Sequence, residues 1–189
     1  MKSILMMMFT LIASTSLFAQ PGENGKNVEM SISGSYQSYS NGGSSQSTSA
    51  FLLSPRVGVF VFEGLELEPE ITALFPSSSE PVYCLNGNVS YNFKIGMGNG
   101  VPFLLVGYGI ANTVPVFNLP TFKSDFSFGV LNLGAGIKAF LSNDIAIRVE
   151  YRYQNFTGQS TSSMFGFTSF TQKVDARINT VQFGLSVFL

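Results

Sequence analysis

Three glutamates at every second position are the residues of this chain best suited to chemistry. Glu66, Glu68 and Glu70 are separated by Leu67 and Pro69, and side chains at such spacing share one face of a β-strand. Neighbouring carboxylates can bind a metal ion or act as general acid and base. They can also be structural, because buried carboxylates persist where basic side chains and hydrogen bonds compensate them.

Histidine, which would complete many catalytic or metal sites of this kind, is absent from the sequence. Its absence excludes a Ser-His-Asp triad and a His-ligated zinc site. The glycine-rich stretch 96–100 precedes a strand pattern rather than a helix, so we expect a turn and not a phosphate-binding loop. Cys84 is the only cysteine, which excludes an intramolecular disulfide. The net charge of −1 offers no basic surface to nucleic acid. No metal or other cofactor is expected.

Residues 145–153 indicate the surroundings of these acids, because they place apolar or aromatic side chains at every odd position and Ala146 with three charged side chains at the even ones. Arg148, Glu150 and Arg152 fall on one face, and period-two alternation predicts a strand. Only 11% of the chain is charged, whereas a typical soluble domain is about 25% charged. A chain so poor in charge that still places charges in mid-strand is best explained by lipid outside and a polar interior.

The N-terminus predicts export. Lys2 is followed by the apolar run 4–13 and the small-residue stretch 14–19, the pattern of a cleavable signal peptide that is shorter than the ~20 residues of a spanning helix. We place cleavage between Ala19 and Gln20, which gives a signal peptide at 1–19 and one domain at 20–189.

Eight alternating segments follow in the predicted domain. They are 28–37, 52–62, 65–75, 82–93, 102–112, 127–141, 145–153 and 174–189. Segments of about 10 residues with one apolar face, separated by turn residues, are typical of a transmembrane β-barrel. Aromatic residues near the segment ends, Phe60 and Phe103 among them, are expected to form two interfacial girdles.

The connections between the segments alternate in length. Those at 63–64 and 142–144 are tight, while those at 38–51, 113–126 and 154–173 are long. Short periplasmic turns and longer extracellular loops are the usual arrangement in such barrels.

The chain resembles the small outer-membrane β-barrel proteins of the OmpA/OmpX type over its whole mature length. The resemblance is carried by Pro102 and Phe103 ahead of Gly107 and Gly109, by the hairpin from Gly134 to Tyr153, and by the C-terminal strand. That strand looks like the signal read by the barrel-insertion machinery, and its residues here are Gln182, Gly184, Val187, Phe188 and Leu189. The resemblance implies an all-β, eight-stranded antiparallel up-and-down transmembrane barrel, a monomer in the outer membrane of a Gram-negative bacterium.

A barrel closed in sequence order would place strand 65–75 opposite strand 145–153. Four acids would then face four bases in an interior that, with eight strands, is only wide enough for side chains to fill. The eight residues are Arg56, Glu66, Glu68, Glu70, Lys138, Arg148, Glu150 and Arg152. We favour a structural ion-pair plug over a metal or catalytic site.

A plugged barrel leaves function to its loops, so a structural or surface-interaction protein without enzymatic activity is the favoured hypothesis. Outer-membrane enzymes of related architecture depend, as families, on a catalytic histidine. A small passive channel is an alternative. A secreted soluble ligand-binding barrel is another, although the tryptophan usual in such proteins is absent.

Two apolar stretches in the predicted long loops are candidate contact sites for a surface ligand or host factor, because large exposed apolar patches often mark interaction sites. Their residues are Phe117, Leu119 and Phe122 in the first and Met164, Phe165, Phe167 and Phe170 in the second. We expect the two stretches to pack on each other or to bind a partner. Simple continuation of the strands beyond the bilayer is the alternative.

Overall fold

A computed structural model of the chain describes residues 26–40, 47–77, 80–93, 99–113, 128–164 and 168–189. The predicted signal peptide lies outside these residues. Within these ranges, no helix has the length and hydropathy needed to cross a membrane. The strands are β1 (Val28–Ser40), β2 (Ser47–Phe62), β3 (Leu65–Pro76), β4 (Val82–Asn92), β5 (Gly100–Ala111), β6 (Phe128–Phe140), β7 (Ile145–Met164) and β8 (Thr168–Phe188).

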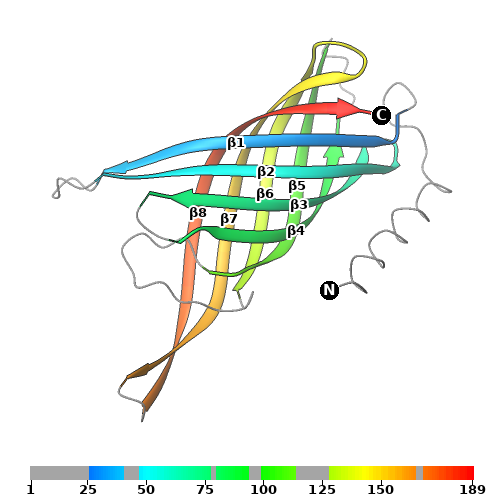
Figure 1. The fold of residues 1–189 in the computed structure, drawn as a ribbon. Coiled ribbons are helices and arrows are strands. Elements are labelled where there is room, and N and C mark those ends of the chain that lie inside the picture. The colour runs from blue at the N-terminus through cyan, green and yellow to red at the C-terminus, as the bar shows by residue number, and fades with distance from the viewer. Residues whose placement is uncertain (1–25, 41–46, 78–79, 94–98, 114–127, 165–167) are drawn as a thin grey trace.

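The eight strands form one closed antiparallel barrel in sequence order (Figure 1). Each strand pairs with the next, and β1 pairs with β8 from Glu29 opposite Phe188 to Gly34 opposite Phe183. The predicted fold is therefore confirmed, as is the position of β3 opposite β7.

Side chains alternate between the interior and the outer wall, as period-two strands require. In β4 the buried side chains are Val82, Cys84, Asn86, Asn88, Ser90 and Asn92. The exposed ones include Tyr83, Leu85, Val89 and Tyr91. Most of the outer wall is apolar while much of the interior is polar, the reverse of a soluble barrel.

The tight turns, the start of β1 and the end of β8 lie at one end of the barrel, which we call the turn end. Gly64 has a φ of 75° and a side chain there would meet the Asn92 carbonyl oxygen, so the two-residue turn requires glycine. The Asn27 and Val28 amides donate to the Leu189 carbonyl (3.2 and 3.3 Å). These bonds join the first and last strands. We call the opposite end the loop end.

At the loop end, the strands run through much of the sequence predicted as loops. The 154–173 connection is wrong as a loop, because β7 and β8 stay paired in unbroken register from Ile145–Val187 to Met164–Thr168. The 38–51 connection is likewise mostly strand, since β1 reaches Ser40 and β2 begins at Ser47. Most of 113–126 lies outside the described residues. Ladder hydrogen bonds need no apolar face, so alternation does not reveal strands that continue into water.

The β7–β8 hairpin consequently extends far past the other strands, toward the lower left in Figure 1. Its last partner on β6 is Gly129, opposite Thr157. At a rise of about 3.3 Å per residue, the stretch from Thr157 to Met164 adds roughly 23 Å.

Candidate functional site

The acids of β3 and the bases of β7 meet across the barrel interior. Glu68 pairs with Arg148 (Nη2–Oε2 3.0 Å), and Glu70 accepts two bonds from Arg152 Nη1 (2.6 and 2.7 Å). Strand closure makes these contacts possible, because β3 and β7 lie on opposite sides of the barrel.

Glu150 of β7 joins three of the four bases. It accepts bonds from Arg56 Nη1 (2.9 Å), Arg148 Nε (3.0 Å) and Arg152 Nε (2.6 Å). The structure brings together all eight residues named as the interior set, and none is more than 4% exposed. Such burial is costly unless each charge is paired and hydrogen-bonded.

A fifth acid, Glu29 of β1, belongs to the same network and was missed in the sequence-based set. Lys138 donates to Glu29 and to Glu66 Oε2 (2.8 Å), and Ser186 Oγ donates to Glu29 (2.6 Å). We call the five acids and four bases the ionic layer. The alternation of residues 28–37 already placed Glu29 on the inner face, so the signal was present.

Neutral side chains also donate to several of the buried carboxylates. Ser90 Oγ donates to Glu68 (2.6 Å), Thr72 Oγ1 to Glu70 (2.6 Å), and Asn88 Nδ2 to Glu70 (3.1 Å). On the loop-end side of the ionic layer, amides bond to one another, with Gln154 donating to Asn132 (2.8 Å) and Asn132 to Asn86 (3.1 Å). These bonds offset part of the desolvation cost of the buried charges.

Lys138 lies among three aromatic rings near the turn end. Its Nζ is 5.6 Å from the ring centroid of Phe60, 5.4 Å from that of Phe103 and 5.8 Å from that of Phe188, within cation–π range. The predicted place of Phe60 and Phe103 in an outer girdle is wrong, since they are 5% and 1% exposed. Both occupy inward positions of their strands, and strand parity decides the face more strongly than aromatic character.

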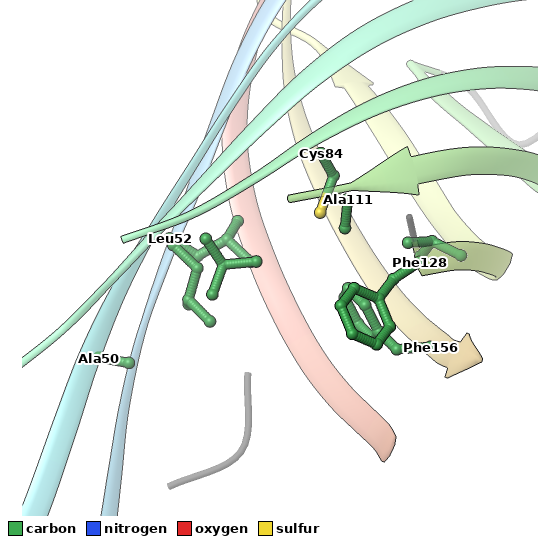
Figure 2. Packing of buried hydrophobic residues seen from close by; sticks show 9 residues of the cluster. Ala50, Leu52, Cys84, Ala111, Phe128 and Phe156 are labelled. Carbon is green, nitrogen blue, oxygen red and sulfur yellow. The ribbon is translucent and has the colours of Figure 1, made fainter. Parts of the chain in front are cut away.

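An apolar layer closes the interior toward the loop end, where the sequence had predicted a polar interior. It comprises Ala50, Leu52, Leu74, Val82, Cys84, Ala111, Phe128, Val130 and Phe156, with Ala176 and Ile178 against it. Figure 2 shows Phe128 and Phe156 of β6 and β7 facing Leu52 of β2. In β2 and β4 here, the inward residues Leu52 and Val82 and the outward residues Phe51 and Tyr83 are all apolar or aromatic, so alternation does not show which side faces inward.

The C-terminal residues fall on both faces of β8. Gln182 is buried and accepts a bond from Arg56 Nη2 (3.2 Å), and Gly184 lies opposite Ser33 of β1. Phe188 is 4% exposed and packs inside, whereas Leu189 is 62% exposed. Val187 lies opposite Met30 of β1.

The candidate loop-contact residues are only partly placed. Met164 and Phe170 belong to β7 and β8, opposite Thr168 and Ser162 respectively. Phe117, Leu119, Phe122, Phe165 and Phe167 lie outside the described residues.

The described part of the chain contains no group of three or more His, Cys, Asp or Glu side chains arranged to hold a metal ion. Glu66, Glu68 and Glu70 instead point to separate basic partners, principally Lys138, Arg148 and Arg152. The acids suited to chemistry in the sequence are thus engaged in ion pairs.

Comparisons with solved structures agree with this architecture. The crystal structure of Neisserial surface protein A (NspA) superposes with a TM-score of 0.56 at 13% identity and covers 86% of this chain and 96% of that one. The N-terminal β-barrel domain of Pseudomonas aeruginosa OprF gives a TM-score of 0.56 at 11% identity, covering 87% and 98%. At such identities these likenesses show the fold.

Sequence relatives extend the comparison. A 22 kDa outer membrane protein of Rhizobium leguminosarum bv. viciae is 36% identical over 110 residues, which cover 57% of this chain and 48% of that protein. The match therefore spans about half the length of this curated relative. The family model described as "Outer membrane protein beta-barrel domain" matches residues 9–187. The family match covers nearly the whole chain, and the polar interior and apolar outer wall agree with it. This chain therefore belongs to the outer membrane protein beta-barrel family and resides in the outer membrane.

Proposed function

We propose that this protein is a closed, non-enzymatic scaffold that displays the β7–β8 hairpin for interaction with partners outside the cell. One observation carries the proposal: β7 and β8 remain paired well past the last residues that pair with β6. In barrels of this kind the turn end faces the periplasm and the loop end faces outward, so the hairpin projects from the cell.

The hairpin offers strand edges for recognition. Pairing of β7 with β6 ends at Thr157, and pairing of β8 with β1 ends at Phe183. Beyond these residues neither edge has a strand partner in the described part of the chain. Free edges present rows of backbone donors and acceptors that an extended segment of another protein can pair with.

The interior supports a scaffold rather than a channel. The ionic layer and the apolar layer lie in series along the barrel axis, and both are formed by closely packed buried side chains. We expect the purified protein in planar bilayers to show no unitary conductance steps. Regular steps with the wild-type protein would favour the passive-channel alternative.

The same residues support the absence of enzymatic activity. The sequence has no histidine, and the buried acids and bases are ion-paired to one another rather than grouped around an open recess. A catalytic group must reach its substrate, and these groups face the filled interior.

Photo-crosslinking in intact bacteria tests the surface role. A photoreactive residue is placed at the hairpin pair Thr161 and Thr171, and at the wall pair Val149 and Phe183, each pair facing one another across β7 and β8. We expect protein adducts from the hairpin positions and none from the wall positions, which contact lipid. An absence of protein adducts at the hairpin, or identical adducts at both pairs, would contradict the proposal.

A further inference from the structure

The outward face of β8 changes character along its length. From Leu189 to Val181 the outward residues are apolar and exposed, among them Phe183 and Leu185. Beyond them, toward the loop end, the outward residues are Asn179, Arg177, Asp175 and Lys173. Tyr151 marks the change, because its hydroxyl donates to Asn179 Oδ1 (2.7 Å) and tyrosine favours the membrane–water interface. Arg177, two residues beyond Asn179, therefore stands near the height of the lipid headgroups, and Lys173 lies about 13 Å further along the strand.

These two bases are unusual in their placement. Of the basic residues in the described ranges, four are buried in the ionic layer and Lys26 lies at the turn end. Arg177 and Lys173 remain, four residues apart on one face of β8. Asp175 lies between them, and its oxygen is 3.8 Å from Arg177 with both side chains more than half exposed. An exposed pair at this distance contributes little, so the guanidinium is available to another anion and the surface stays positive.

Backbone donors add to the same surface. The pairing of β1 with β8 ends at Gly34 opposite Phe183, and further along the Gln37 side chain reaches across and donates to the Asn179 carbonyl (3.3 Å). At the turn end Leu189 exchanges both backbone bonds with Val28. Because bond direction alternates along a strand, the residues of β8 at odd positions point their amides toward β1. The amides of Arg177, Asp175 and Lys173 therefore lie on the edge that β1 has left.

We propose that this surface, formed by Arg177, Lys173 and the adjoining β8 edge, binds the phosphate of a phosphorylated lipid headgroup in the outer leaflet. The guanidinium supplies paired donors that match a phosphate, and the ammonium supplies a second positive charge. A lipid fits better than a protein strand, because the surface faces sideways directly above the apolar wall where acyl chains lie. The inference rests on the outer-membrane location; of the two free hairpin edges, it assigns the β8 edge around Arg177 to lipid and leaves the β7 edge to a protein partner.

The test uses the purified full chain in detergent micelles, titrated with a diphosphorylated acylated glycolipid and followed by native mass spectrometry. The test variant is Arg177→Gln with Lys173→Gln, and the control is Lys26→Gln at the opposite end. Heat-modifiable gel migration verifies that each variant is a folded barrel. We expect the double variant to bind the lipid about tenfold or more weakly, the usual effect of losing charge-assisted bonds, and the control to bind as wild type does.

Two further binding experiments distinguish a lipid headgroup from free phosphate as the ligand. Removing the phosphates from the glycolipid should weaken its binding to wild type about as much as the double substitution does. Added salt should weaken the binding of the intact glycolipid. Inorganic phosphate should compete only at far higher concentration than the lipid. Equal binding by wild type and double variant overturns the proposal, as does equal binding of the dephosphorylated lipid. The proposal is also overturned if inorganic phosphate competes as strongly as the lipid. It fails as well if an extended peptide binds the β8 edge and displaces the lipid.

Discussion

The two layers that fill the barrel interior solve the same problem by opposite chemistry. The ionic layer packs nine charged side chains from β1, β2, β3, β6 and β7, each in at least one ion pair. The apolar layer packs aliphatic and aromatic side chains, chiefly from β2 to β8, with no charge among them. The side chains of the ionic layer and most of those of the apolar layer are as buried as those of a protein core.

The difference lies in what each layer tolerates. A charge pair needs a particular geometry, and losing one member leaves the other buried without compensation. An apolar layer depends on shape, and it accepts exchange among side chains of similar volume better than it accepts a polar atom. The ionic layer should therefore fix which strands face one another, while the apolar layer closes the mouth.

Breaking the ionic layer should have the largest effect. Arg148→Met keeps a long side chain but removes the partner of Glu29, Glu68 and Glu150, so we expect a loss of about 3–5 kcal/mol in the free energy of unfolding. Urea unfolding in phospholipid vesicles measures it. Arg177→Met, which removes an exposed pair, is the matched control and should change stability by no more than about 1 kcal/mol. Equal losses of stability in both variants would mean that burial does not determine the cost of breaking an ion pair.

The outer wall beside the ionic layer should reject a charge that the interior accepts. Val149 lies between Arg148 and Glu150 in sequence but points to the apolar wall, and Val149→Arg should cost about 2–4 kcal/mol, the penalty for a basic residue at mid-membrane. Thr157→Arg, on the same face of β7 at its last pairing with β6, should stay within about 0.5 kcal/mol. Heat-modifiable migration and urea melting report both. A harmless Val149→Arg would contradict the assignment of this wall to lipid.

Thr72→Val sharpens the comparison on the polar side. Thr72 Oγ1 donates to Glu70 and accepts from Ser54 Oγ and Asn86 Nδ2 (3.2 Å each). Substitution by valine leaves these groups short of a partner in a dry interior, at an expected cost of about 1–3 kcal/mol. Urea titration against wild type gives the value, and Thr72→Ser, which keeps the hydroxyl, should recover part of the loss.

Val130→Thr is the reciprocal exchange in the apolar layer. Val130 is fully buried among apolar neighbours, so the new hydroxyl is expected to cost about 1–3 kcal/mol. The same unfolding experiment applies, with Val130→Ile as a control that changes volume without adding a polar atom. If Val130→Thr leaves stability unchanged, the loop end holds hydroxyl partners and the contrast between the layers fails.

The smallest effect on stability is expected for an ion pair that is exposed to water. Lys26 donates to Asp144 and to the Phe188 carbonyl (2.8 Å) at the turn end. Lys26→Met should cost no more than about 1 kcal/mol, as partly exposed pairs usually do. A loss comparable to that of Arg148→Met, measured in the same vesicles, would show that the closure of β1 on β8 depends on this contact.

Most of the fold and part of the site were predictable from local patterns. Alternation located β3 to β6 to within two residues at each end, and it placed Glu66, Glu68 and Glu70 on one inner face. It did not reveal the hairpin continuation from Gly158 to Met164, because a two-stranded ribbon in water has no apolar face that would produce an alternating pattern. It misjudged Phe60 and Phe103, because an aromatic ring near a strand end suits both an interface and a core.

By itself, the sequence determined the class of the protein: eight strands whose polar faces turn inward and whose apolar faces turn outward. That follows because side-chain direction in a strand is a local property and because charge is scarce in this chain. Only the tertiary structure decided that Glu29 joins the network, that Phe188 packs beside Lys138, and that an apolar layer closes the loop end. These contacts join residues as far apart as Lys138 and Glu29, 109 positions along the chain, and such meetings are set by strand register and barrel closure.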